Sequence, residues 1–134
     1  MKALIIDDVD YIRKSISKVL GDQGFTCEVA ENGRVASDLI QANEYDLIIT
    51  DIMMPDMDGF EFLDFLRKQS AKISKTPVMA ISGGSKTIDS ELALKMMEEK
   101  ADLILQKPFS KLELLAAVTK LVGGAKLGQM TSAT

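Results

Sequence analysis

Short apolar segments recur along the chain, and segments with the spacing of amphipathic helices lie between them. The five apolar runs are ALII, FTCEVA, YDLIIT, PVMAIS and ADLILQ, at residues 3–6, 25–30, 45–50, 77–82 and 101–106. Three of them are almost continuously apolar, which is typical of parallel strands that helices cover on both faces. The pattern therefore predicts five strands of one parallel sheet.

Stretches between and after these strands carry apolar residues at helical spacing. The first runs from Ile12 to Leu20 and predicts a helix that ends at Gly21. The second is expected to begin at Asn32, whose side chain can cap a helix. The others lie at residues 62–66, 88–96 and 114–122, the last one before Gly123 and Gly124. This alternation predicts a three-layer α/β sandwich with right-handed crossovers.

The length of the chain and the character of its end indicate one domain and a tail. With 134 residues the chain can bury a core without disulfides or metals. We expect residues 1–122 to fold as one unit. Residues 123–134 are glycine-rich and lack periodicity, so we expect them to form a flexible tail.

Composition excludes several classes of chemistry and location. The chain has no histidine, so its own side chains supply neither a histidine base nor a histidine zinc ligand. The single Cys27 cannot form an internal disulfide. A net charge of -4 without a basic run argues against nucleic-acid binding. No apolar run approaches the length of a signal peptide or a membrane span, so we expect a cytoplasmic protein.

Polar residues capable of chemistry follow four of the five predicted strands. They are Asp7 and Asp8 after the first strand, Asp51 after the third, Ser82 at the very end of the fourth and Lys107 after the fifth. In open parallel sheets, ligands bind beyond the carboxyl ends of the strands. Each residue also has a simpler explanation, such as a helix cap at Asp8 or Asp10. Their common placement at one edge nevertheless favours a shared site.

The charges of these residues indicate a metal ion and an anion. Three carboxylates and one ammonium leave a net charge of about −2, which favours a hard divalent cation such as Mg²⁺. One anionic group then fits beside the metal, with Lys107 and the Ser82 hydroxyl placed to receive its oxygens. A phosphoryl group meets this description, because its transfer requires positioning and charge neutralisation. Asp51 is the preferred nucleophile, since it stands alone whereas Asp7 and Asp8 are paired.

The sequence resembles the receiver domain of bacterial two-component response regulators, in particular the single-domain, chemotaxis-regulator-like kind. The resemblance spans about residues 2–122 and rests on IIDD at 5–8, DIMMPDMDG at 51–59, AIS at 80–82 and KPF at 107–109. It implies a flavodoxin-like fold: a doubly wound, five-stranded parallel sheet in the order 2-1-3-4-5 with five helices. It also implies a phospho-accepting signalling switch rather than an enzyme.

The resemblance implies roles for the acidic residues. Asp51 would be the phospho-acceptor, and Asp7 and Asp8 would bind Mg²⁺. Asp51 and the backbone carbonyl of Met53 would complete the metal ligands of the protein. The phosphoryl group would come from a phosphohistidine on a sensor histidine kinase or a histidine phosphotransfer protein.

The resemblance also implies how the phosphoryl group acts. Ser82 would be the switch hydroxyl, and Lys107 would pair with a phosphoryl oxygen next to a cis Lys107–Pro108 bond. A monomer would then control a downstream protein through residues 87–122. Ile104 stands where many receivers carry an aromatic residue, three positions before the lysine, which argues against aromatic gating of that surface.

Three alternatives remain open at this point. A receiver excised from a larger multidomain regulator or hybrid kinase would carry the same motifs. We expect the stand-alone form, because Met1 directly precedes the first strand and the tail is short. A haloacid dehalogenase-like phosphatase would need a further acidic pair, which ADLILQKPF does not offer. A flavin-binding module would need a Ser/Thr/Gly-rich loop after the first strand, where DDVD would repel a phosphate.

Slow loss of the phosphoryl group is expected from two further positions. In the family, the side chains two positions after the acceptor and two after the hydroxyl tune hydrolysis, and here they are Met53 and Gly84. Neither can hydrogen-bond to an attacking water, so hydrolysis lacks intramolecular assistance. We predict a moderately long-lived phosphoform, measured as the decay of labelled protein in Mg²⁺ buffer. A half-life of only a few seconds would contradict this prediction.

Overall fold

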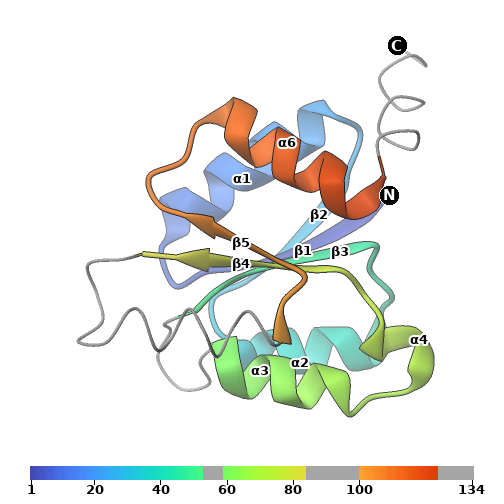
Figure 1. Ribbon diagram of the computed structural model, residues 1–134. Helices are drawn as coiled ribbons and strands as arrows, with labels where there is room; N and C mark the ends of the chain where they lie inside the picture. Colours follow the sequence, from blue (N-terminus) through green and yellow to red (C-terminus); the bar gives the residue numbers. More distant parts are fainter. Residues whose placement is uncertain (53–58, 84–99, 124–134) are drawn as a thin grey trace.

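The computed structural model describes residues 1–52, 59–83 and 100–123, which form a parallel sheet between two layers of helices (Figure 1). The sheet has five strands in the order β2-β1-β3-β4-β5. They are β1 (Lys2–Ile6), β2 (Thr26–Ala30), β3 (Leu47–Asp51), β4 (Val78–Ser82) and β5 (Leu103–Gln106). All five predicted strands are confirmed, and so is the doubly wound order that the resemblance implied.

Each face of the sheet has its own apolar core. The helices α1 (Asp10–Asp22) and α6 (Lys111–Val122) cover one face, and α2 (Gly33–Ala42), α3 (Gly59–Arg67) and the short α4 (Ala71–Ser74) lie on the other (Figure 1). Successive strand residues point to opposite faces, so Ile5 and Ile49 belong to one core while Leu4 and Ile48 belong to the other. Burying each such side chain contributes about 1.5–3 kcal/mol. The central strands are therefore fixed from both sides.

The helix ends show which local signals determined them. The Asn32 side-chain oxygen accepts a hydrogen bond from the Val35 amide at 2.9 Å and caps α2, as predicted. The predicted end of α1 at Gly21 is wrong, because the helix continues to Asp22. Gln23 follows as the C-cap, and the chain turns away at Gly24, whose positive φ of 94° only glycine adopts readily. The Phe25 amide then donates to the Leu20 carbonyl at 3.0 Å and closes the turn.

Helix α6 has a complete capping box at its start. The Ser110 hydroxyl accepts a hydrogen bond from the Glu113 amide at 3.0 Å. In return, the Glu113 carboxylate accepts a hydrogen bond from the Ser110 amide at 3.1 Å. The spacing Ser-x-x-Glu is the sequence signature of this cap, and our sequence analysis missed it. The end of α6 before Gly123 is confirmed. Helix α4 was not predicted, and the helix predicted at 88–96 lies outside the described residues.

Arg67, the last residue of α3, connects that helix to later parts of the chain. Its guanidinium donates to three backbone carbonyls, those of Ser74, Thr76 and Lys100, at 2.6, 3.2 and 2.9 Å. It also lies 3.3 Å from the carboxylate of Asp102, just before β5. Asp64, on the same helix, forms an ion pair with the Lys100 ammonium. The start of β5 is therefore held to the end of α3.

Candidate functional site

The acidic side chains lie together where β1 and β3 end. These strands are adjacent and parallel, with Ile6 opposite Thr50, so the next residues, Asp7 and Asp51, reach the same level of the sheet edge. Asp7, Asp8 and Asp51, which we call the acidic cluster, each bring one carboxylate oxygen to within 4.8 Å of the others. Asp7 and Asp51 are buried and Asp8 is exposed. The three carboxylates among the predicted metal ligands are thus close enough to share one ion.

Lys107 reaches the acidic cluster from the end of β5. Its Nζ lies 3.3 Å from Asp7 Oδ2 and 3.6 Å from Asp51 Oδ2. Its backbone amide donates to the Ser82 carbonyl at 2.8 Å. The Lys107–Pro108 peptide bond is cis, as the resemblance implied. One mostly buried ammonium group therefore faces two buried carboxylates.

The electrostatic balance of the acidic cluster favours a divalent cation. At an effective dielectric constant of about 20, the buried carboxylates of Asp7 and Asp51 repel each other by at least about 3 kcal/mol, and each Lys107 contact attracts by about 5 kcal/mol. The exposed Asp8 adds a third negative charge against the single ammonium group, and the desolvation of Asp7 and Asp51 costs several kcal/mol more per ion. A hard cation such as Mg²⁺ fits these oxygen ligands and would offset that cost. The Met53 carbonyl, predicted as a further ligand, lies outside the described residues.

The loop between β1 and α1 fixes Asp7 and leaves Asp8 exposed. Asp7 Oδ1 accepts the Val9 amide at 2.9 Å, while Asp7 Oδ2 faces the lysine. Val9 occupies the N-cap position of α1 without a side-chain cap, so the alternative of a cap at Asp8 or Asp10 is wrong. Asp10 instead pairs with Lys14 at 2.9 Å. Chiefly this hydrogen bond from Lys14 holds the pKa of the Asp10 carboxyl below its ordinary value.

Ser82 lies at the same edge of the sheet, on the strand next to β3. It is the last residue of β4 and follows Ile81, which pairs with Asp51. Its side chain is buried, one residue beyond the level of Asp51. Ile104 is half-buried in β5 and pairs with Ala80, and Gly84 lies outside the described residues. The predicted residues on β1, β3, β4 and β5 thus share one edge.

Gly59 allows α3 to begin directly against the strand that carries Asp51. Its amide donates to the Ile52 carbonyl at 2.9 Å. A Cβ atom at position 59 would lie 2.6 Å from the Asp51 carbonyl oxygen and 3.0 Å from the Ile52 Cα. The sequence indicated only a turn at DMDG, because this close approach depends on tertiary packing.

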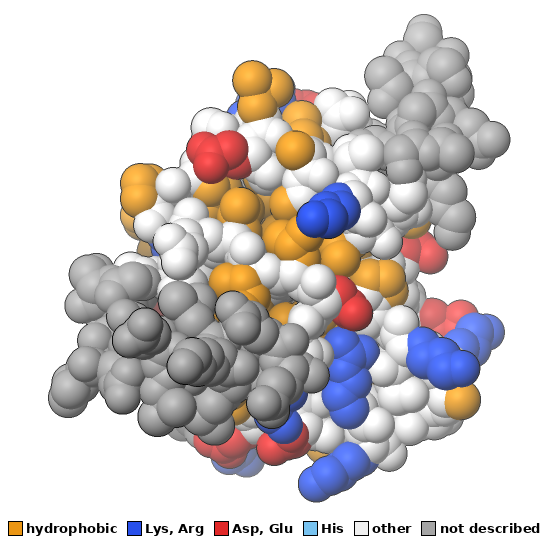
Figure 2. Space-filling model, viewed as in Figure 1, with side chains coloured by type: hydrophobic (Ala, Val, Ile, Leu, Met, Phe, Trp, Pro, Cys, Tyr) orange, Lys and Arg blue, Asp and Glu red, His pale blue; other side chains and the backbone are white. Residues whose placement is uncertain are grey.

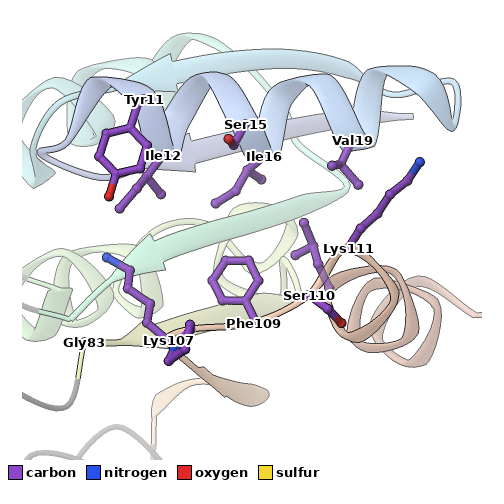
Figure 3. A pocket seen from close by; sticks show the side chains of 12 residues that line it. Tyr11, Ile12, Ser15, Ile16, Val19, Gly83, Lys107, Phe109, Ser110 and Lys111 are labelled. Carbon is purple, nitrogen blue, oxygen red and sulfur yellow. The ribbon is translucent and has the colours of Figure 1, made fainter.

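A groove opens beside Lys107, between α1 and the start of α6, with a cavity volume of about 760 Å³. We call it the α1–α6 groove. Figure 3 shows Ile16 on α1 facing the ring of Phe109 on the opposite wall, with Tyr11 and Ile12 nearer the lysine. Sequence analysis missed the groove, because its two walls come from opposite ends of the chain and each apolar stripe alone indicates only a core.

Nearly the whole chain matches one known family. The model of the response regulator receiver domain matches residues 3–119. The chain belongs to this family. The receiver is a phospho-acceptor rather than a true enzyme, and the acidic cluster is the pocket of a phospho-accepting switch. This membership favours neither the phosphatase nor the flavin module considered above.

The receiver is similar to about half of the length of several curated regulators. It is 36% identical over 121 residues to the probable transcriptional regulator ycf29 of Pyropia yezoensis, covering 90% of the receiver and 53% of that relative. It is 36% identical over 126 residues to the cell cycle transcriptional regulator CtrA of Caulobacter vibrioides, covering 94% and 52%. The chain therefore spans about half the length of the curated relatives it matches.

Solved structures of receivers from different contexts share its fold. The signal receiver domain of a signal transduction histidine kinase from Syntrophus aciditrophicus matches with a TM-score of 0.81 and 28% identity, over 93% of this chain and 92% of that one. The chemotaxis response regulator CheY4 of Vibrio cholerae matches with a TM-score of 0.77 and 33% identity, over 90% and 97%. One fold thus occurs both within a kinase and in a chemotaxis regulator.

We predict opposite effects for two glycine-to-alanine substitutions. Gly59→Ala should lower the free energy of unfolding by about 1–3 kcal/mol, because its methyl group would collide with the backbone of Asp51. Gly21→Ala lies inside α1 with nothing within 4 Å of the new atom, and should raise the free energy by up to about 1 kcal/mol. Urea denaturation measures both. A neutral Gly59→Ala would contradict the close packing of α3 against β3.

Proposed function

We propose that Asp51 accepts a phosphoryl group from the phosphohistidine of a partner protein, with Mg²⁺ and Lys107 assisting. The supporting observation is the acidic cluster, whose oxygens lie within 4.8 Å of one another while Lys107 faces two of its members. Asp51 is the proposed acceptor because it ends the central strand, whereas Asp7 and Asp8 follow one another after β1. These three aspartates and the Met53 carbonyl would hold Mg²⁺.

The transfer replaces one bond to phosphorus with another. An oxygen of Asp51 forms the new O–P bond as the N–P bond breaks. The electron pair of the N–P bond returns to the imidazole nitrogen of the donor. Bound Mg²⁺ would neutralise charge on the phosphoryl oxygens. The Lys107 ammonium then pairs with one phosphoryl oxygen, and the Ser82 hydroxyl donates to another. Movement of Ser82 shifts the population between two packings of the output surface.

We propose that the phosphodonor docks in the α1–α6 groove. The groove opens beside Lys107 and has apolar side chains on both walls. Tyr11 is 71% exposed at its α1 wall, and an exposed aromatic beside an apolar groove is typical of an interaction surface. An amphipathic helix of the donor would fit such a groove and bring its histidine to the acidic cluster. Lys107 and Lys111 add positive charge that suits a phosphorylated partner.

The output surface is proposed to be residues 87–122, of which β5 and α6 lie in the described part. In β5, Leu103, Ile104 and Leu105 are all half-buried, and Leu112 of α6 is 78% exposed. Figure 2 shows hydrophobic side chains gathered over these two elements. This supports a protein target that makes apolar contacts. Ile104 would respond to phosphorylation by packing changes rather than by rotation of an aromatic ring.

A cytoplasmic monomer that acts through protein contacts is the form that we propose. The net charge of -4 and the lack of a basic run support protein rather than nucleic-acid partners. None of the helices in the three described segments is long and apolar enough to cross a membrane. A sensor histidine kinase or a histidine phosphotransfer protein would supply the phosphoryl group, because this chain has no histidine.

Asp51→Asn is expected to abolish phosphorylation, because an amide is not a nucleophile for this transfer. Wild-type protein incubated with phosphorylated kinase and Mg²⁺ should retain about one acid-stable, base-labile phosphate per chain. Asp38→Asn, at an exposed position of α2, is the matched control and should be labelled like the wild type. Unchanged labelling of Asp51→Asn, or turnover of many phosphates without retention, would overturn the proposal.

Tyr11→Ala is expected to slow phosphotransfer from the kinase by about ten-fold or more, as truncation of an aromatic contact does at interfaces. Phosphorylation by phosphoramidate should be unchanged, since a small donor needs no docking surface. Leu112→Ala is the matched control, because Leu112 is similarly exposed but does not line the groove. Equal slowing with both donors would place the effect of Tyr11 in the chemistry and contradict the docking site.

A further inference from the structure

Arg13 links the two ends of the loop that carries the first two members of the acidic cluster. Its Nη1 donates to the backbone carbonyl of Asp7 at 2.5 Å. Its Nη2 lies 3.1 Å from Asp10 Oδ1. The Arg13 side chain is only 14% exposed, whereas that of Asp10 is 64% exposed. The guanidinium therefore packs against the loop and does not extend into solvent.

Asp8 depends on the contacts of its neighbours in this loop, among them the Asp7 amide, which donates to the Ala30 carbonyl at 3.2 Å. Within residues 1–52, 59–83 and 100–123, no hydrogen bond or ion pair holds the Asp8 carboxylate. Its position therefore follows the backbone between Asp7 and Asp10. Val9, the N-cap residue, contributes its amide to Asp7 Oδ1 but no side-chain cap. Arg13 lies on α1, and its hydrogen bond to the Asp7 carbonyl ties the backbone of the loop to that helix.

We propose that Arg13 is a positioning residue of the metal site: by fixing the Asp7 carbonyl, it sets where the Asp8 carboxylate lies relative to Asp7 and Asp51. The inference rests on the proposed role of these aspartates in binding Mg²⁺. A planar guanidinium can serve two acceptors at once, which the point charge of lysine does less well. Removing a group that orients metal ligands typically costs 10- to 100-fold in metal affinity.

A charge effect of Arg13 would act in the opposite direction. A cation beside the acidic cluster repels Mg²⁺, so its removal alone would tighten metal binding. Positioning instead predicts weaker binding when the guanidinium is lost. The sign of the change in Mg²⁺ affinity therefore separates the two effects.

The test is the Mg²⁺ affinity of the unphosphorylated protein, measured by calorimetry and by amide NMR shifts. Arg13→Gln is expected to weaken Mg²⁺ binding by about ten-fold. Arg13→Lys should recover only part of the affinity, because it keeps the charge but lacks the planar guanidinium that donates to the Asp7 carbonyl. Asp10→Asn removes only the exposed contact and should change the affinity by less than about two-fold. If Arg13→Gln does not fold, the affinity of Arg13→Lys compared with that of the wild type still tests the inference.

Two results would overturn the inference. If Arg13 only stabilises the fold, Arg13→Gln lowers Tm equally with and without Mg²⁺ and leaves the affinity unchanged. If Arg13 acts only as a charge, Arg13→Gln binds Mg²⁺ more tightly and Arg13→Lys binds like the wild type. Asp8→Asn in the same assay separates this inference from the proposed function. Equal Mg²⁺ binding by Asp8→Asn and the wild type would overturn both.

Discussion

The ammonium group of Lys107, set between the buried carboxylates of Asp7 and Asp51, is the interaction on which the site depends. Its two partners come from β1 and β3, while the lysine itself follows β5. The lysine can reach both only because all the strands run parallel and end at one edge. β4 lies between, and its Ser82 carbonyl fixes the lysine backbone. The order of the strands is therefore a requirement of the chemistry and not merely its scaffold.

The same arrangement sets stability against function. Two carboxylates are buried beside one another, and the cost of removing both from water is only partly offset by the single ammonium group of Lys107. Apolar strands covered on both faces supply the rigidity that holds them there. Gly59 adds to this, because α3 can start against the backbone of Asp51 only without a side chain at that position. Packing thus holds the acidic side chains in the positions that binding of a cation and a phosphoryl group would require.

The parts of the fold that depend on local signals could be predicted from the sequence. Apolar runs, the Asn32 cap and the polar residues at the strand ends all carry their information within a few residues. The end of α1 could not be placed by apolar spacing alone, because the decisive feature is the backbone conformation of Gly24. The contacts of Arg13 and Arg67 were also missed, since their acceptors are mainly backbone carbonyls, which no residue type marks. The α1–α6 groove exists only once distant segments pack together.

The anchoring of the chain around Arg67 has a mechanical consequence for β5. At its start, Lys100 and Asp102 are tied to α3 through the guanidinium of Arg67. At its other end, Lys107 is joined to the Ser82 carbonyl and to the acidic cluster. β5 is therefore held at both ends, to α3 at its start and to β4 and the acidic cluster just after its last residue. Because the start of β5 is tied to α3 and its residues pair with β4, a displacement of Lys107 would be passed on mainly to the segment that leads into α6.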